Sequence, residues 1–246
     1  MVHGLSSVLK LYIVNEYPKS GGTWLGQMLS RSLDLPFPRN RLPVWGSCIM
    51  HGHYLNPWGM KNVVVPWRDG RDVMVSWYHH FFLRNELSTG VSTDVLRRKV
   101  PFEDHDDVKN NLPDFIEASF RRGLYPRFTW SDFVRQWYPR KDVVHVKYED
   151  LWNDTGKELE RIVFNLTRKR LERQKIEEIV EEFSFERQSG RKPGEERKNS
   201  FLRKGIVGDW RNYFSREACE AFDYFAGDEL ILLGYERNRS WIFANL

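Results

Sequence analysis

Short apolar, β-branched segments alternate along this chain with segments of helical periodicity. Val8–Val14 is followed by a glycine-containing break and then, from Thr23, by apolar residues at helical spacing. Lys61–Trp67 and Asp142–Lys147 repeat this order of strand, turn and helix. Fully apolar strands separated by helices are typical of a parallel sheet covered by helices. We therefore predict an α/β fold with a central parallel β-sheet flanked by helices.

Several of the predicted helices have recognisable start or stop signals. Asp69 can cap the helix that follows the second strand. Thr155 and Glu158 match a capping box at the start of the helix after the third strand. Ser215 can cap a final helix, which Gly234 ends.

Length and composition limit the class of protein. A chain of 246 residues is consistent with a single domain over residues 1–246, in which the polar segment 84–127 is expected to form a lid or insertion. Two cysteines exclude a disulfide framework, and no stretch approaches the length of a membrane span or the apolar core of a signal peptide. We expect a cytoplasmic protein. The net charge of +4 fits a small anionic ligand and does not require nucleic acid.

The segment between the first strand and the first helix, Tyr17–Trp24, predicts an anion-binding loop. Backbone N–H groups at the start of a helix bind anions, and glycines let the backbone approach a ligand closely. The segment lacks the Gly-Lys-Ser/Thr ending of a Walker A motif, so it does not favour ATP with magnesium. Its basic, hydroxyl and glycine residues are Lys19, Ser20, Gly21, Gly22 and Thr23.

Two further segments carry basic side chains at predicted turns. Arg68 follows the second strand, and Ser76 lies eight positions later in the next helix. Arg203, Lys204 and Gly205 form a basic turn towards the end of the chain. Because a guanidinium group can bind phosphate bidentately, both segments predict contacts to an anion.

In this order the segments resemble the sulfotransferases that use 3′-phosphoadenosine 5′-phosphosulfate (PAPS). PKSGGTW is similar to the family's 5′-phosphosulfate loop, although the family most often has Thr at position 22. Arg68–Ser76 is similar to its 3′-phosphate element. Val146–Leu151 and Arg203–Trp210 are similar to two other family elements. The resemblance spans residues 12–214 and implies a single-domain, P-loop-like sulfotransferase fold.

The resemblance also implies roles for individual residues. The phosphosulfate would bind at residues 19–23, and the 3′-phosphate at Arg68, Ser76 and the basic turn. Tyr148 would contact the adenine side, and Trp24 and Phe185 would sandwich the base. The product would be adenosine 3′,5′-bisphosphate (PAP). The implied cofactor-binding residues are Lys19, Ser20, Gly21, Gly22, Thr23, Trp24, Arg68, Ser76, Tyr148, Phe185, Arg203, Lys204 and Gly205.

Two histidines are candidates for the general base. Sulfuryl transfer to a hydroxyl or amine requires a proton acceptor, and histidine suits this near neutral pH. Alignment with the family favours His53 and leaves His51 as the alternative. By the same resemblance Lys19 would stabilise charge on the leaving group, and Ser76 would restrain Lys19. His-x-His also occurs in metal sites, but no acidic residue or further histidine lies nearby in the sequence, so we expect no metal.

The acceptor is less constrained. Ten Trp and ten Tyr suit sugars by stacking, or flat phenols and sterols by burial. We expect residues 36–45, 54–58 and 84–125 to line the acceptor site, and the polar segment 84–127 favours a carbohydrate or other polar metabolite. The last helix lacks the pattern linked to dimers in the cytosolic animal members, so no oligomeric state is predicted.

Two other functional classes fit parts of the sequence. A P-loop-like kinase or NTPase would require magnesium and ATP, for which the expected motifs are absent. A polyanion-binding module could use the charged segments 168–173 and 187–203, but both mix acidic with basic residues and are typical of solvated faces.

Overall fold

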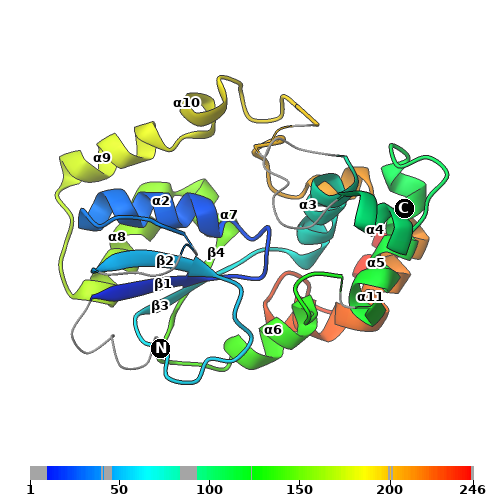
Figure 1. Ribbon diagram of the computed structural model, residues 1–246, viewed down its shortest axis with the longest axis horizontal. Coiled ribbons are helices and arrows are strands. Elements are labelled where there is room, and N and C mark those ends of the chain that lie inside the picture. The colour runs from blue at the N-terminus through cyan, green and yellow to red at the C-terminus, as the bar shows by residue number, and fades with distance from the viewer. Residues whose placement is uncertain are drawn as a thin grey trace. The chain divides into compact units, whose positions relative to one another are not determined.

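The computed structural model divides into two compact units (Figure 1). It describes residues 10–39, 41, 46–83, 93–122, 124–198, 200 and 202–244. Unit 1 comprises the chain up to Arg68 and Gln136–Arg191, and unit 2 comprises Asp69–Arg135 and the chain from Lys192 onward. Parts of the predicted first strand, the acceptor lining and the segment 84–127 fall on residues 8–9, 40, 42–45, 84–92 and 123, which lie outside the described residues.

Unit 1 is built on a four-stranded sheet in which every neighbouring pair of strands is parallel (Figure 1). The strands lie in the order β2-β1-β3-β4, so the first strand has a neighbour on each side. This confirms the predicted parallel α/β architecture. The strands are β1 (Leu11–Asn15), β2 (Cys48–Gly52), β3 (Val63–Trp67) and β4 (Val144–Lys147).

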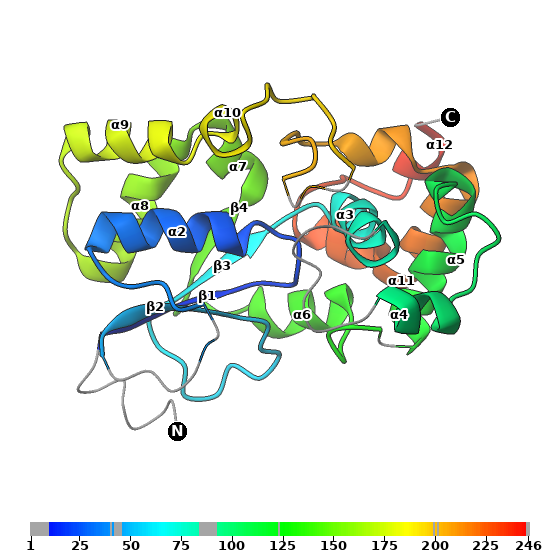
Figure 2. The same ribbon diagram turned by 45° about the horizontal axis from the view of Figure 1, so that its top comes forward.

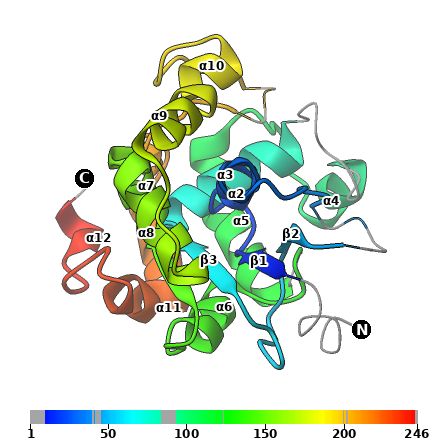
Figure 3. The same cartoon turned by 90° about the vertical axis from the view of Figure 1, so that its left-hand side faces the viewer.

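Helices α2 and α8 cover one face of this sheet. Each of them contacts the strands as well as the other helix, and α9 packs on both of them (Figures 2 and 3). Leu25, Leu29 and Ile162 belong to the core between these helices and the strands. The helices of unit 1 are α2 (Gly22–Leu33), α7 (Tyr148–Asn153), α8 (Thr155–Thr167), α9 (Arg173–Glu182) and α10 (Phe185–Ser189).

Unit 2 is mainly helical among its described residues. Its α5 and α11 pack along each other, and α3 contacts both of them (Figure 2). No helix in the described ranges combines the length and hydrophobicity required to cross a bilayer. The elements are α3 (Gly70–Phe82), α4 (Thr93–Lys99), α5 (Val108–Arg122), α6 (Trp130–Trp137, which the unit boundary cuts), η1 (Asp209–Asn212), α11 (Arg216–Leu232) and α12 (Trp241–Ala244).

Two of the predicted helix caps are confirmed and one is wrong. The side chains of Asp69 and Ser215 accept hydrogen bonds from the first turns of α3 and α11. Thr155 does not cap α8, because the carboxylate of Asp154 accepts the Lys157 N–H at 3.0 Å. Thr155 is instead the first helical residue, and its hydroxyl donates to the Leu151 carbonyl. A carboxylate one residue earlier thus takes the capping position.

A buried arginine holds the start of α3 to the last part of the chain. The side chain of Arg71 is only 1% exposed and donates to Asp69 and to Glu236. Its guanidinium lies 3.8 Å from the ring centroid of Trp210 and 4.7 Å from that of Trp241. A buried charge is tolerated only when it is paired and hydrogen-bonded, and here two carboxylates and two aromatic faces meet this requirement.

Replacing this arginine is expected to destabilise the protein strongly. The substitution Arg71→Met should lower the free energy of unfolding by about 3–5 kcal/mol, because it leaves the carboxylates without their buried partner. Urea denaturation followed by circular dichroism measures the loss. Arg173→Met is the matched control, since Arg173 is 93% exposed and pairs with Glu177 on the surface of α9, and it should change stability by less than about 0.5 kcal/mol. Equal losses in both variants would contradict the role of Arg71.

Candidate active site

The loop between β1 and α2 contains two residues in the left-handed conformation. Their φ angles are +74° at Lys19 and +94° at Gly21. Glycine adopts this conformation without steric cost, whereas at Lys19 it costs about 1–3 kcal/mol. Strained backbone of this kind is concentrated at functional sites, so the loop geometry supports the anion-binding role predicted from its sequence.

Side chains from other elements of unit 1 close around this loop. A Cβ atom at Gly21 would lie 2.7 Å from Cδ2 of Tyr148, so any other residue would clash unless the tyrosine ring shifted. Arg68 donates to the Lys19 carbonyl at 3.0 Å, and its guanidinium lies 4.7 Å from the Tyr148 ring centroid. Trp24 contacts the same tyrosine edge-on, with 5.8 Å between ring centroids. The structure therefore brings together the side chains of Trp24, Arg68 and Tyr148, which the sequence placed in three separate motifs.

The backbone at the start of α2 already binds a carboxylate. Glu16, only 4% exposed, accepts the Gly22 N–H at 2.6 Å through Oε2. Helix N-termini attract negative charge because their first N–H groups have no partner within the helix. Glu16 was not among the residues predicted from the sequence. The only available signal was its position, directly after an apolar strand and before the glycine loop.

Glu16 is held as an anion by its neighbours. Burial raises its pKa, but the hydrogen bond from His51, the charges of His51 and His53, and the Gly22 N–H together outweigh burial and lower the pKa below its ordinary value. An ionised carboxylate only accepts hydrogen bonds, so Nε2 of His51 donates to Oε1 of Glu16 at 2.9 Å. His51 is buried as well.

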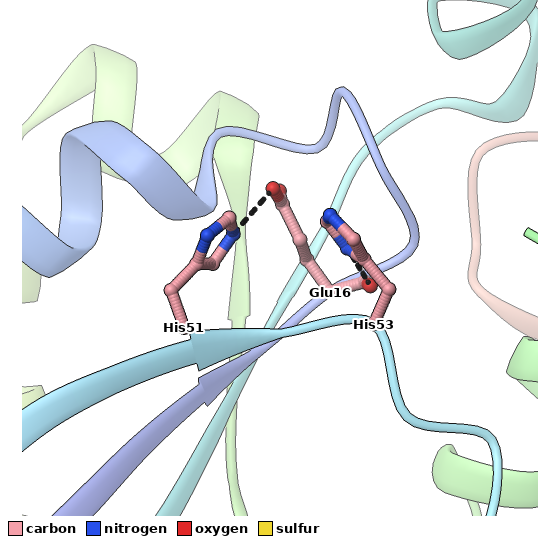
Figure 4. Close-up of side chains that lie close together, drawn as sticks. All are labelled: Glu16, His51 and His53. Carbon is pink, nitrogen blue, oxygen red and sulfur yellow. Dashed lines mark hydrogen bonds and ion pairs between the residues drawn. The ribbon is translucent and has the colours of Figure 1, made fainter. Parts of the chain in front are cut away.

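The two candidate bases lie on either side of Glu16 (Figure 4). His51 is in β2, paired with Val14 of β1, and His53 follows the end of the same strand. Their rings meet edge-on with centroids 5.0 Å apart. Since β1 and β2 are parallel neighbours, their carboxyl ends bring Glu16 and both histidines to one edge of the sheet.

The hydrogen bond of His53 defines its tautomer. Its Nδ1 lies 3.0 Å from the backbone carbonyl of Glu16, which can only accept, so Nδ1 carries the proton and Nε2 carries the lone pair. Burial lowers the pKa of His53, and the Glu16 charge opposes this only in part. His53 is therefore a neutral imidazole with an accepting nitrogen at neutral pH.

In unit 2, the basic turn is fastened to α3 by Asp72. Its buried carboxylate accepts the N–H groups of Gly208 and Trp210, each at 2.8 Å. Ser76 lies four residues after Asp72 on α3, so the two share a helix face. His79 continues this face and contacts Tyr213, with 5.3 Å between ring centroids. The face of α3 that carries Ser76 is thus turned towards the segment that carries the basic turn.

The cations of the basic turn are paired with carboxylates in unit 2. Arg203 donates to Glu196 at 2.6 Å and also to Asp209, and Lys204 donates to Asp209 at 2.9 Å. Burial raises the pKa of Glu196, but the Arg203 hydrogen bond and the nearby cations lower it overall. Burial and the Arg203 charge lower the pKa of His79 to about 4, so this imidazole is neutral.

The predicted site residues fall on both units. Phe185 is the first residue of α10, and the guanidinium of Arg191 lies over its ring. Two residues earlier, the backbone carbonyl of Phe183 accepts the indole N–H of Trp24, so this segment lies beside Trp24. The sandwich of Trp24 and Phe185 remains a prediction. Unit 1 carries Lys19, Ser20, Gly21, Gly22, Thr23, Trp24, His51, His53, Arg68, Tyr148 and Phe185, and unit 2 carries Ser76, Arg203, Lys204 and Gly205.

A family model for the sulfotransferase domain matches residues 60–234, which is more than half of the chain. The fold and this match define an enzyme of the sulfotransferase class, as predicted. The chain belongs to the sulfotransferase domain family.

Individual relatives agree with this assignment. The chain is 25% identical over 261 residues to amine sulfotransferase of Oryctolagus cuniculus, covering 87% of this chain and 78% of that protein. It is 26% identical over 258 residues to sulfotransferase 1B1 of Mus musculus, covering 86% and 79% of the two chains.

Solved structures have the same fold. The crystal structure of mouse sulfotransferase SULT7A1 complexed with PAP superposes with a TM-score of 0.65, at 21% identity over 90% of this chain and 84% of that chain. Retinol dehydratase in complex with androsterone and inactive cofactor PAP has a TM-score of 0.60, at 20% identity over 90% and 80%. These similarities confirm the predicted fold class.

The contact between Gly21 and Tyr148 can be tested by stability. Gly21→Ala should lose about 1–2 kcal/mol for its left-handed backbone and a further 1–3 kcal/mol for the clash with Tyr148. Gly190→Ala is the matched control, because Gly190 has a φ of +68° with open space around it and should lose the backbone contribution alone. Urea denaturation measures both losses. Adding Tyr148→Ala should cancel the extra loss of Gly21→Ala, and equal losses at the two glycines would rule out the clash.

Proposed function

We propose that this protein transfers a sulfuryl group from PAPS to a hydroxyl or amine group of a small-molecule or carbohydrate acceptor and releases PAP. The observation that carries the proposal is the loop of unit 1. Its first helical N–H binds a carboxylate, its backbone is left-handed at Lys19 and Gly21, and a neutral imidazole lies beside it. The two similar structures contain PAP, which supports the same cosubstrate.

The residues of the loop suit a phosphosulfate. Lys19 supplies a positive charge, Ser20 and Thr23 supply hydroxyl donors, and the start of α2 supplies N–H groups. In this structure the Gly22 N–H donates to an anionic group, the carboxylate of Glu16. For the 3′-phosphate, the family resemblance implies Arg68 of unit 1 and, in unit 2, Ser76 and the basic turn at 203–205.

Two side chains do the chemical work in this proposal. PAPS supplies the sulfuryl group together with a phosphate leaving group. Nε2 of His53 accepts the proton of the acceptor hydroxyl or amine, and the Nδ1 bond to the Glu16 carbonyl holds the ring in the required tautomer. Lys19 stabilises the negative charge that grows on the oxygen bridging to the leaving phosphate.

Of the two histidines, we assign the base to His53. His51 is buried, and its Nε2 proton is already donated to Glu16. An imidazole that donates to a buried carboxylate through Nε2 orients that carboxylate. We therefore assign His51 a positioning role, through Glu16.

For the acceptor, we propose only the functional group that receives the sulfuryl group. Similar proteins include one named amine sulfotransferase, and retinol dehydratase has been crystallised with androsterone and with retinol. These names favour small amines and alcohols. A panel of amines, phenols, sterols and sugars, each supplied with radiolabelled PAPS, distinguishes these from the carbohydrate predicted from the sequence.

The cosubstrate can be tested by thermal unfolding. PAP at about 100 times its dissociation constant stabilises a protein by about 2.7 kcal/mol, which is roughly 5–10 °C in a domain of this size. We expect this increase in Tm with PAP and a much smaller one with AMP, which lacks the 3′-phosphate. A larger increase with ATP and magnesium, or none with saturating PAP, would contradict the sulfotransferase proposal and favour the kinase alternative.

Turnover by histidine variants tests the assignment of the base. His53→Asn should lower kcat by about 10²–10⁴-fold and leave the Tm increase with PAP unchanged, because it removes only the proton acceptor. His51→Asn should lower kcat far less. Sulfated product is quantified with radiolabelled PAPS. Near-normal turnover in His53→Asn, or a larger loss in His51→Asn, would reverse the assignment.

A further inference from the structure

Three potential metal ligands converge at the edge of the sheet in unit 1. The carboxylate of Glu16 and one ring nitrogen from each of His51 and His53 all lie within 4.8 Å of one another. One pair, Nε2 of His51 and Oε1 of Glu16, is already 2.9 Å apart. Donors that share a zinc ion at 2.0–2.2 Å lie about 3–3.5 Å apart. A shift of roughly 1 Å in the His53 ring or the carboxylate would therefore bring all three within bonding distance of one ion.

From the sequence alone we expected no metal ion, because no acidic residue lies near the His-x-His pair along the chain. The structure supplies that neighbour from another strand, since Glu16 precedes His51 by 35 positions but follows the adjacent parallel strand. Two imidazoles and one carboxylate form a donor set that suits divalent transition metals such as zinc, cobalt and nickel. A hard ion such as magnesium prefers oxygen ligands only and fits this set poorly.

Burial and charge also favour a cation here. Glu16 and His51 are buried, and His53 is partly buried, so the donors are held by the surrounding structure and retain limited exposure for entry of an ion. Glu16 contributes a negative charge, whereas both histidines bind a metal only as neutral ligands. Figure 4 shows the two rings flanking the carboxylate, so that an ion near its oxygens would face both imidazoles.

We propose that Glu16, His51 and His53 bind one divalent transition-metal ion, with zinc as the reference ion, and that this ion inhibits sulfuryl transfer. The inhibition rests on the proposed function, whereas the binding does not. A coordinating nitrogen uses its lone pair, so an ion bound to Nε2 of His53 removes the proton acceptor of the reaction. Coordination of His51 through Nε2 likewise releases the proton that now bonds Glu16.

Binding is measured by isothermal titration of zinc into chelator-treated protein, without cosubstrate or acceptor. We expect one ion per chain, with a dissociation constant raised at least ten-fold in Glu16→Gln and in His53→Asn, since even loss of an outer-sphere partner costs that much. Glu177→Gln, an exposed substitution of the same type, and the double variant Cys48→Ser, Cys219→Ser should bind zinc normally. Unchanged affinity in Glu16→Gln, or loss of binding in the cysteine variant, would overturn the site.

The control for folding is the melting temperature of each variant, measured with and without PAP. A variant that unfolds cooperatively and responds to PAP but does not bind zinc supports the site directly. His51→Asn provides a second, independent variant if Glu16→Gln does not fold. Zinc binding to the wild-type protein that is unaffected by both His51→Asn and His53→Asn would overturn the proposal.

Turnover of the wild-type protein then tests the inhibition. We expect stoichiometric zinc to reduce sulfated product at least ten-fold and a chelator to restore it. Zinc binding with unchanged or increased turnover would overturn the inhibitory role. If the protein binds zinc but neither responds to PAP nor transfers sulfate, the metal site stands and the proposed function fails. If it transfers sulfate but binds no zinc, the reverse holds.

Discussion

A buried carboxylate at the carboxyl end of β1 organises the candidate active site. Glu16 satisfies the first N–H of α2, orients His51 and, through its backbone carbonyl, sets the tautomer of His53. Parallel pairing of β1 with β2 makes this possible, because it brings the ends of both strands to one edge. An ionised group that is buried without partners is costly, so the backbone N–H and the histidines stabilise the buried Glu16 carboxylate in this structure.

In unit 2, buried charged residues likewise hold other segments of the chain through their hydrogen bonds. Asp72 is buried at the second residue after the start of α3, and it captures two backbone N–H groups of the segment that carries the basic turn. Directly before it, Arg71 is held between two carboxylates and two indole rings. Adjacent residues of one motif thus fix two different segments from late in the chain. Both lie within Arg68–Ser76, the segment that resembles a 3′-phosphate element, but their own contacts are structural.

Local patterns in the sequence were sufficient for much of the fold. Apolar runs predicted three of the four strands, and the turn chemistry of Asp69 and Ser215 predicted two helix starts. β2 was missed because its apolar part, Cys48–Met50, is too short for periodicity to identify. The capping box at Thr155 was wrong because the pattern ignores a competing carboxylate at Asp154.

In the candidate site, too, some residues could be predicted from local sequence patterns and others could not. Glycines and basic residues marked the anion-binding loop, since their conformational freedom and charge are properties of single residues. Glu16 could not be assigned from the sequence, because its role depends on which strand lies beside β1. The order β2-β1-β3-β4 is decided by long-range pairing, and no local pattern encodes it. The family resemblance already favoured His53 over His51, and the hydrogen bonds of both histidines to Glu16, which is far away in the sequence, add support that no local pattern could give.

In each unit, carboxylates of the protein bind the N–H groups and cations that would bind an anionic ligand. Glu16 binds the N–H at the start of α2, and Glu196 and Asp209 bind the cations of the basic turn. These contacts order the donors before a ligand arrives, which reduces the conformational entropy lost on binding. A ligand must displace these carboxylates from the donors. Its net affinity is therefore the difference between the donor–ligand and the donor–carboxylate interactions, both of which are charge-assisted. A singly charged anion gains little from such an exchange, whereas a phosphate with more charge and more acceptor oxygens gains more. This favours ligands that carry several phosphate or sulfate groups over isolated small anions.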